Sequence, residues 1–367
     1  MSVKLKYDRI WNFNAGPAAI PLEVLEEVQK SWFNYGGTGM NLMEWSHRSK
    51  EFDAIHNEAI ALVKRICGLG DDYHVLFVQG GASTQFAMLP MNFLGGGTAD
   101  YINTGAWSKK AIAEAKLFGT ANVAFDGSKV EFKRLPKQDE LTLTPGAKYL
   151  HITSNNTIKG TQFFDFPKVD VPLVADMSSD ILSHKLDYNQ FSMIYAGAQK
   201  NLGPSGLTLV ILKDDFFKTA ITEGIPTMLQ YGTHVEANSL YNTPPTFGIY
   251  MLREVLKWVE NNGGLEGMDA RNKAKADLLY GFFRENPDYF KCPVEEGSES
   301  WMNVCFRLPN EELEAKMISE SKAAGFSGMK GHRSVGGLRI SMYNASPIEA
   351  VQDVISFMKE FQAANQA

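Results

Sequence analysis

Hydrophobic residues recur at helical spacing in the first seventy positions of the chain. Apolar side chains between residues 21 and 32 fall on one side of a predicted helix, and Pro21 stands at its first turn, where proline is tolerated. A second stripe, from Phe52 to Ile66, predicts another amphipathic helix. Both helices are expected to cover a hydrophobic layer with their apolar sides.

The pattern changes after residue 70, where short apolar runs alternate with polar or helical connections. The runs cover residues 75–78, 101–102, 123–125, 149–152, 173–175, 193–196 and 207–212. Such runs are typical of strands that are buried on both faces of a parallel sheet. We therefore predict an α/β fold with a mostly parallel seven-stranded sheet.

The last third of the chain has a different order of elements. An amphipathic helix from Met251 to Trp258 ends at Asn261-Asn-Gly-Gly264, and a helix, an alternating strand near residues 302–308 and a further helix follow. We place a domain boundary near Gly263. The prediction is a large domain of residues 19–262 and a smaller α+β domain of residues 1–18 and 263–367.

Composition and charge exclude several classes of protein. The 367 residues are 44% hydrophobic and 21% charged, as in ordinary globular proteins, and the net charge of −6 argues against nucleic acid as a partner. Three cysteines without CxxC spacing predict neither a disulfide framework nor a metal site. Without a signal peptide or a membrane-length apolar run, we expect a cytoplasmic protein that does not bind membranes.

Polar residues follow the ends of the predicted strands, where parallel sheets bind their ligands. The segments in question are Gln79–Thr84, Asn103–Trp107, Thr153–Thr157, Asp176 and Gly197–Lys200. The first of them contains Gly80-Gly-Ala-Ser-Thr84 between a strand and a helix, which can bind a phosphate through main-chain N–H groups. A tight turn that needs glycine explains the same residues, and the spacing of nucleotide-binding loops is missing.

Three further residues suggest covalent chemistry on a flat ring. A lysine between apolar runs, such as Lys200, is partly desolvated, which lowers its pKa and makes its amine a nucleophile for carbonyl carbon. Asp176 can pair with a ring nitrogen, and Trp107 can stack on the ring. Each has a simpler alternative: a surface lysine, a helix cap or salt bridge, and a hydrophobic plug.

Two basic clusters can supply the cations that an acidic protein needs for anionic substrates. One is His47-Arg48, and the other is His332-Arg333 with Arg339 nearby. Arginine grips carboxylate or phosphate groups through two hydrogen bonds. Taken one at a time, such residues are more often solvated surface charges.

Several segments together carry a resemblance to a known family. They are Asn12–Ala18, Glu44–Arg48, Tyr195–Asn201, Tyr241–Thr246 and Lys330–Arg333. Along essentially its whole length the chain resembles the phosphoserine aminotransferases, a family of fold-type I, class V enzymes that depend on pyridoxal phosphate. Some positions depart from the family pattern: Ala15, Ala82-Ser83 and Asn156 stand where other members have serine, Gly-Arg and glutamate.

The resemblance implies a role for each candidate residue. Lys200 would carry pyridoxal phosphate as a Schiff base, Asp176 would pair with the pyridine nitrogen, and Trp107 would stack on the ring. The other implied cofactor contacts are Ala82, Ser83, Thr157 and Gln199, with Asn242 and Thr243 reaching the cofactor phosphate of the neighbouring subunit in a homodimer with shared active sites. The implied substrate contacts are His47 and Arg48 from one subunit and His332, Arg333 and Arg339 from the other.

The implied reaction transfers the amino group of L-glutamate to 3-phosphohydroxypyruvate and yields O-phospho-L-serine and 2-oxoglutarate. This would place the enzyme in serine biosynthesis, and in pyridoxine biosynthesis if it also acts on 4-phosphohydroxy-L-threonine. A class V aminotransferase of the alanine–glyoxylate or serine–pyruvate type is the alternative, but its substrates carry no phosphate and leave two arginine-histidine clusters unexplained. Desulfuration through a cysteine persulfide, or a non-enzymatic scaffold, fits the residues less well.

Overall fold

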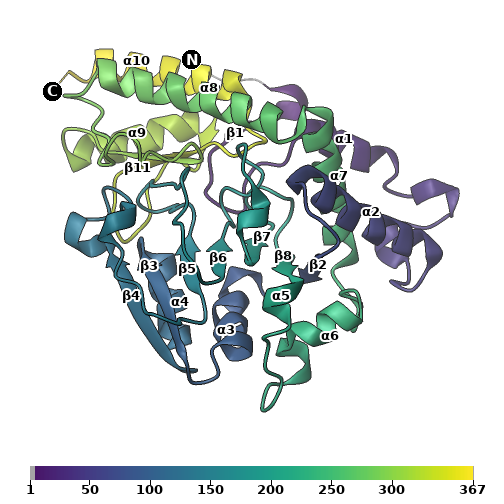
Figure 1. The fold of residues 1–367 in the computed structure, drawn as a ribbon. Coiled ribbons are helices and arrows are strands. Elements are labelled where there is room, and N and C mark those ends of the chain that lie inside the picture. Colours follow the sequence, from purple (N-terminus) through teal and green to yellow (C-terminus); the bar gives the residue numbers. More distant parts are fainter. Residues whose placement is uncertain (1–4, 367) are drawn as a thin grey trace.

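A computed structural model describes residues 5–366, and within that range the chain forms a seven-stranded sheet flanked by helices (Figure 1). The strands are β2 (Tyr73–Val78), β3 (Thr98–Asn103), β4 (Thr120–Asp126), β5 (Leu150–Thr153), β6 (Leu173–Asp176), β7 (Met193–Gly197) and β8 (Thr208–Lys213). Their order across the sheet is β2-β8-β7-β6-β5-β3-β4. Strand β8 is antiparallel to both of its neighbours, and the other pairings are parallel. The predicted α/β class and mostly parallel sheet are confirmed.

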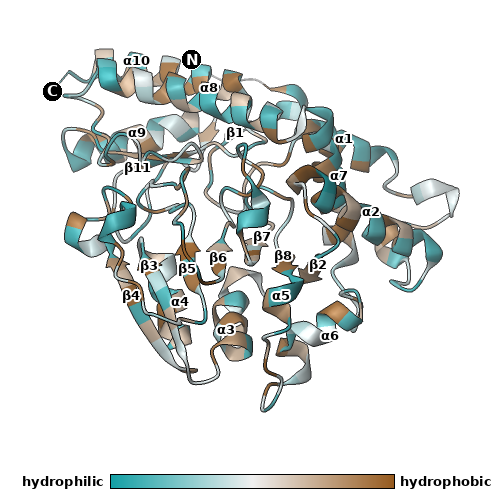
Figure 2. Cartoon of the chain, in the orientation of Figure 1, coloured by the Kyte–Doolittle hydropathy of each residue, from teal (hydrophilic) through white to brown (hydrophobic). Residues whose placement is uncertain are grey.

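Helices cover both faces of this sheet, as the hydrophobic runs require. The chain contains α1 (Leu22–Lys30), α2 (Lys50–Cys67), α3 (Gly81–Phe93), α4 (Ala106–Ala115), α5 (Asp214–Phe217), α6 (Tyr231–Glu236) and α7 (Thr246–Asn261). Alternate residues of β2 pack on opposite sides: Val75 and Phe77 join the cluster with α2 and α7, and Leu76 and Val78 join the cluster with α3 and α4. The hydrophobic colours of the strands in Figure 2 lie between these helical layers.

A second hydrophobic core lies beyond the carboxyl ends of the parallel strands, at the top of Figure 1. It is built from β1 (Trp11–Asn12), α8 (Gly264–Glu285), β9 (Asn303–Phe306), α9 (Glu311–Ala323), β10 (Phe326–Ser327), β11 (Leu338–Ser341) and α10 (Ile348–Ala364). Strand β1 pairs with β10, so a segment near the N-terminus joins the last third of the chain.

Helix α8 takes part in both cores. Leu265 and Met268 near its start pack with the sheet, whereas Ala276 and Phe283 belong to the second core. The helix begins next to Gly263, where the sequence placed its domain boundary. The division into residues 19–262 and the two flanking segments stays a prediction, because a helix that serves both cores does not separate them.

Lys275 lies fully buried in α8, between the residues that serve the two cores. Its ammonium group donates hydrogen bonds to the main-chain oxygens of Met342, Tyr343 and Ser346, at 2.9, 2.8 and 3.0 Å. Burial lowers the pKa of Lys275 well below its usual value. Three carbonyl acceptors use all three ammonium hydrogens, so this lysine binds the turn after β11 firmly to α8.

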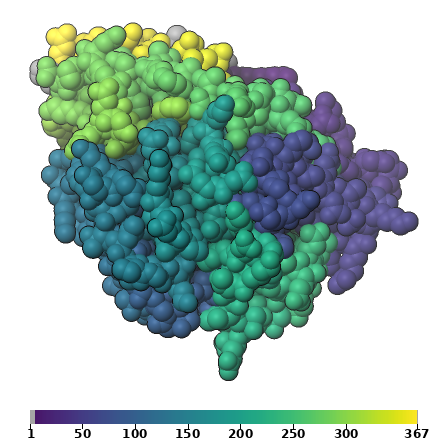
Figure 3. Space-filling view, viewed as in Figure 1, coloured from purple at the N-terminus to yellow at the C-terminus, as the bar shows by residue number. Residues whose placement is uncertain are grey.

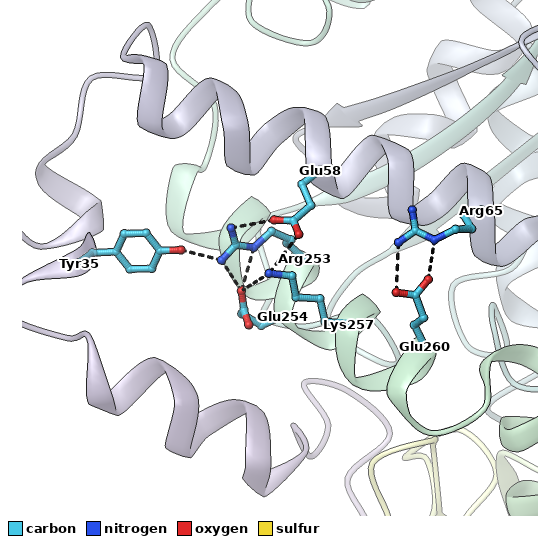
Figure 4. A network of polar contacts seen from close by, with 7 residues as sticks. All are labelled: Tyr35, Glu58, Arg65, Arg253, Glu254, Lys257 and Glu260. Carbon is cyan, nitrogen blue, oxygen red and sulfur yellow. Dashed lines mark hydrogen bonds and ion pairs between the residues drawn. The ribbon is translucent and has the colours of Figure 1, made fainter. Parts of the chain in front are cut away.

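The segment between α1 and α2 projects from one side of the molecule, shown in purple in Figure 3, and a partly buried network of charged residues anchors it. Arg253 of α7 donates to the Tyr35 hydroxyl at 2.7 Å, to Glu58 of α2 at 3.2 Å and to Glu254 at 2.8 Å (Figure 4). Lys257 completes the network with Glu58 at 3.2 Å. Two cations therefore balance two carboxylates, and the phenol ties the projecting segment to α2 and α7.

Replacing Arg253 by methionine is expected to destabilise the protein by roughly 3–5 kcal/mol, because it leaves the buried carboxylate of Glu254 without its main partner. The side chain of Arg253 is 8% exposed, and that of Glu254 is 10% exposed. Urea unfolding of both proteins measures the difference in the free energy of unfolding. Arg65→Met is the matched control, since the Arg65–Glu260 pair in Figure 4 is 58% and 39% exposed and its loss should matter far less. Equal destabilisation by the two substitutions would contradict the stabilising role that we give to the Arg253 network.

Candidate active site

A cavity of about 380 Å³ lies at the carboxyl ends of β5, β6 and β7, between the sheet and the second core. The sheet register aligns the strand ends, since Asp176 pairs with Thr153 on one side and with Tyr195 on the other. Of the residues predicted from the sequence, the cavity is lined by Ala82, Ser83, Trp107, Thr157, Asp176, Gln199, Lys200, His332 and Arg339. Residues from distant parts of the chain thus meet at one site.

Lys200 follows β7 and extends into the cavity beside Trp107. Its Nζ lies 5.6 Å from the centroid of the Trp107 ring, and the indole N–H donates to the Thr157 hydroxyl at 3.0 Å. Burial lowers the pKa of Lys200, and the nearby Asp176 carboxylate opposes this shift. Gly16 packs against the side chain of Lys200. Its φ of +141° suits glycine, and a Cβ added there would lie only 3.2 Å from Lys200 Cγ, so a larger residue would crowd the lysine. The site therefore offers a desolvated, oriented amine.

Asp176 is the last residue of β6 and is 5% exposed. Its Oδ1 accepts hydrogen bonds from the Ser178 N–H at 3.0 Å and from the Ser178 hydroxyl at 2.6 Å. Burial raises the pKa of Asp176, while Lys200 and Ser178 act in the opposite direction. Among residues 5–366 no basic side chain forms an ion pair with it. A buried carboxylate of this kind provides a binding partner for a positively charged ligand group.

The segment after β2 forms the predicted strand-to-helix turn. Gly80 has φ +93°, the Thr84 hydroxyl donates to its carbonyl at 3.0 Å, and α3 begins at the next residue. The first N–H groups of a helix have no partner inside the helix, and they carry its positive dipole end. Ala82 and Ser83 place this helix start at the cavity wall, where an anion can bind.

Positive charge enters the cavity from the second core. Arg339 of β11 donates from Nη1 to the Thr157 carbonyl at 2.6 Å, while its Nε is buried without a hydrogen-bond partner among the described residues. Burial lowers the pKa of His332, and Arg339, Arg333 and Lys110 add to the shift. The positive charge therefore comes from Arg339, with Arg333 and Lys110 near His332, and it suits a substrate with more than one negative group.

Five of the predicted residues do not line this cavity. They are His47, Arg48, Asn242, Thr243 and Arg333. Arg48, Thr243 and Arg333 are exposed, and His47 and Asn242 are partly exposed. Within one copy of the chain these residues therefore do not join Lys200 in lining the cavity. Within the described part of the chain, no group of three or more His, Cys, Asp or Glu side chains could hold a metal ion.

Sequence reasoning gave no individual role to several residues that line the cavity, among them Ala15, Gly16, Thr153 and Ser178. Gly16 lies in the segment Asn12–Ala18, which carried the resemblance but received no role. Ser178 could have been found from its position, because a residue two places after an aspartate commonly donates to that carboxylate. Thr153 lies in a segment that was predicted from its strand, whereas Ala15 and Gly16 reach the cavity through tertiary contacts that local sequence does not encode.

The departure at Asn156 has a structural role. Its Nδ2 donates to the Thr104 carbonyl, and its Oδ1 accepts from the N–H groups of Ile158 at 3.0 Å and Lys159 at 3.2 Å. The side chain is buried and does not line the cavity. It therefore shapes the loop that carries Thr157 without facing the ligand.

Comparison with known proteins agrees with this geometry. The sequence model of the family described as aminotransferase class-V matches residues 10–354. The phosphoserine aminotransferase of Desulfosudis oleivorans is 56% identical over 97% of this chain and 99% of its own length. The chain belongs to the phosphoserine aminotransferase family of class-V aminotransferases. The family resemblance predicted from the sequence is therefore confirmed.

Solved structures of this family have the same fold. The phosphoserine aminotransferase from Bacillus circulans subsp. alkalophilus superposes with a TM-score of 0.95 and 52% identity, covering 97% of this chain and 99% of that one. The PLP-bound phosphoserine aminotransferase from Trichomonas vaginalis gives 0.91 and 37%, covering 96% and 100%. The likeness therefore extends over nearly the whole chain.

Proposed function

We propose that this aminotransferase transfers the amino group of L-glutamate to 3-phosphohydroxypyruvate, which yields O-phospho-L-serine and 2-oxoglutarate, with pyridoxal phosphate as cofactor. The observation that carries the proposal is the cavity in which Lys200, Asp176 and Trp107 converge below His332 and Arg339. Relatives named for this activity match the chain over nearly its full length, which supports the same reading. The substrates of such an enzyme are small molecules.

The residues present fit pyridoxal phosphate. When bound, the cofactor supplies an electron-withdrawing ring that stabilises negative charge on the substrate α-carbon. Asp176 would hold the protonated ring nitrogen, and the start of α3 with Ala82 and Ser83 would hold the phosphate. Trp107 would cover one face of the ring, its indole fixed by Thr157. A buried carboxylate, a free helix start and a flat side chain are the features that the group requires.

Lys200 has two tasks in this proposal. Its amine would hold the cofactor covalently, and once free it would take the proton from the α-carbon of the amino acid and return it to a carbon of the cofactor. Both tasks require an uncharged amine, and burial favours that form by lowering the pKa of Lys200. Gly16 limits the directions in which the side chain can move.

The anion contacts would come from two subunits. Arg339 and His332 line the cavity of their own chain and are suited to the carboxylate and phosphate of the substrate. Arg333, exposed beside His332, would join them as the substrate enters. His47 and Arg48 would come from the partner of a homodimer, as would Asn242 and Thr243 toward the cofactor phosphate. Their exposed or partly exposed positions away from the cavity support this arrangement.

Mixing two inactive variants tests the shared site. Lys200→Ala and Arg48→Ala subunits, unfolded and refolded together, should recover about a quarter of the wild-type rate, because half of the dimers are mixed and each mixed dimer has one intact site. The assay is the glutamate-dependent formation of phosphoserine. Lys200→Ala mixed with Asp176→Asn is the matched control and should recover no activity, since both residues belong to the same subunit's site. Recovery in both mixtures, or in neither, would contradict the arrangement.

Substrate competition tests the phosphate requirement. With the glutamate-loaded enzyme, 3-phosphohydroxypyruvate should react with a kcat/KM roughly 10²-fold or more above that of pyruvate or glyoxylate, because a site built to bind an anion rejects analogues without one. Single-turnover rates with each keto acid measure the ratio. Equal rates would favour the alanine–glyoxylate or serine–pyruvate type, which the names of the relatives do not support.

The remaining expectations concern the location of the protein, a second substrate and nucleic acid. No helix within residues 5–366 is long and apolar enough to cross a membrane. We propose the cytoplasm as the location, in line with a role in serine biosynthesis. Action on 4-phosphohydroxy-L-threonine in pyridoxine biosynthesis and the absence of a nucleic-acid partner stay predictions.

A further inference from the structure

A second buried carboxyl group lies behind Asp176. Asp180, four residues farther along, is 3% exposed and does not line the cavity. Its Oδ2 accepts a hydrogen bond from Gln162 Nε2 at 3.4 Å. The amide orientation of Gln162 is set independently, because its Oε1 accepts the main-chain N–H of Trp301 at 2.9 Å. The Oδ2 atom of Asp180 is therefore an acceptor, and the other oxygen, Oδ1, faces a different partner.

That partner is the hydroxyl group of Ser154, next to the end of β5. Ser154 Oγ is hydrogen-bonded to Asp180 Oδ1 and also lies 3.0 Å from the main-chain oxygen of Asp176. The hydroxyl has one hydrogen and faces two oxygens. Each of the two contacts has a hydrogen of its own if Asp180 carries a proton on Oδ1 and donates it to Ser154, which leaves the Ser154 hydrogen for the Asp176 carbonyl.

The surrounding charges favour the same protonation state. Asp176 and Lys200 are the charged groups that act on Asp180, and the phenols of Tyr188 and Tyr343, which feel its charge, are themselves buried and neutral. One amine thus faces two buried carboxyl groups. Burial raises the pKa of Asp180 to about 7, and the negative charge of Asp176 adds to the rise while Ser154, Gln162 and Lys200 oppose it.

We propose that Asp180 is a positioning residue for the reaction. As a neutral acid it donates a hydrogen bond to Ser154, which in turn holds the main-chain carbonyl of Asp176, so that Asp176 remains the single buried negative charge opposite the cofactor ring. The proposal rests on the proposed function, because it assigns Asp180 a task in presenting Asp176 to the ring. The same contacts link the second core to the site, since Gln162 joins Asp180 to Trp301.

Two substitutions of Asp180 in the holoenzyme separate a neutral donor from an anion. Asp180→Asn keeps an N–H group toward Ser154 and an oxygen toward Gln162, so we expect kcat to stay within about threefold of wild type near neutral pH. Asp180→Ala leaves Ser154 and Gln162 without their partner, and we expect kcat to fall roughly tenfold with a smaller change in KM. If Asp180→Ala does not fold, Ser154→Ala replaces it, with the same expected fall in kcat.

Two further readouts distinguish positioning from a purely structural role. The infrared spectrum of the wild-type holoenzyme should contain a protonated carboxyl band that Asp180→Asn lacks. Pyridoxal phosphate should also bind less tightly to the wild type as the pH rises past neutrality, because ionised Asp180 no longer donates a hydrogen bond to Ser154. Asp180→Asn should not show this loss of affinity. The proposal is overturned if Asp180→Asn is as impaired as Asp180→Ala, or if Ser154→Ala works at the wild-type rate. The absence of the carboxyl band from the wild-type spectrum would also overturn it.

The outcome for the proposed function is read from the wild-type protein. A wild type that neither binds pyridoxal phosphate nor transaminates overturns both proposals. A wild type that does both, combined with the wrong order of the two Asp180 variants, overturns only the role of Asp180. The infrared comparison does not depend on activity, so it keeps the two outcomes apart.

Discussion

The Lys200→Ala protein is expected to lose transaminase activity by roughly 10³–10⁴-fold, at the upper end of what a positioned acid–base group contributes. The substitution removes the amine that we propose binds the cofactor and moves the α-carbon proton. No other amine replaces it at the cavity wall, which among the described residues includes no second lysine. Borohydride treatment of the wild type should fix the cofactor to a peptide that contains Lys200, and peptide mass mapping of the variant should find no such label.

Lys213 provides a matched control for this substitution. It too ends a strand, but β8 is antiparallel to its neighbours, so Lys213 lies at the opposite edge of the sheet, with its Nζ 5.5 Å from the ring of Tyr73. Lys213→Ala should keep both the label and the activity. A label on any residue other than Lys200 in the wild-type protein would refute the assignment.

Asp176→Asn is expected to lower kcat by roughly 10²–10³-fold, the cost of removing one preorganised electrostatic partner. The amide keeps the shape of the side chain and can still accept from Ser178, but it carries no charge to hold a protonated ring nitrogen. The loss should therefore appear mainly in kcat, with pyridoxal phosphate bound more weakly. Steady-state kinetics and cofactor titration measure both, and a kcat near the wild-type value would refute the role of Asp176.

The same substitution should stabilise the cofactor-free protein at neutral pH. Burial raises the pKa of Asp176 above its value in an unfolded chain, so the charged carboxylate opposes folding once the pH exceeds that lower value of about 4. The penalty is absent in more acidic solution and grows as the pH rises through the folded pKa. Urea midpoints of the two proteins should thus coincide at acidic pH and separate at neutral pH, with the asparagine variant more stable. A functional charge is kept here at the expense of stability.

Much of this site could be predicted from local sequence, for a definable reason. Parallel strands end at one edge of the sheet, so residues that directly follow apolar runs, such as Asp176 and Lys200, must lie near one another. Trp107 and the turn at Gly80 follow the same rule. The direction of β8 could not be predicted this way, because a buried apolar run looks alike in parallel and antiparallel pairs.

Other parts of the site depend on contacts that sequence spacing does not encode. Arg339 reaches the cavity because β11 belongs to the second core, and Ala15 does so because β1 pairs with β10. The resemblance pointed to Arg339 but left Ala15 without a role. The contact between Asp180 and Ser154 was not predicted, because the geometry of one hydroxyl between two oxygens exists only in the folded chain.

The lysine buried in α8 has a mechanical consequence for the cavity. Lys275 ties the carbonyl groups of Tyr343 and its neighbours to the helix, and the Tyr343 hydroxyl donates to the carbonyl of Ala15 at 2.7 Å, on the cavity wall. Because the first turns of α8 pack against the sheet and its later turns pack in the second core, a shift of this helix is expected to displace the cavity wall. The shape of the substrate site thus depends on packing far from Lys200.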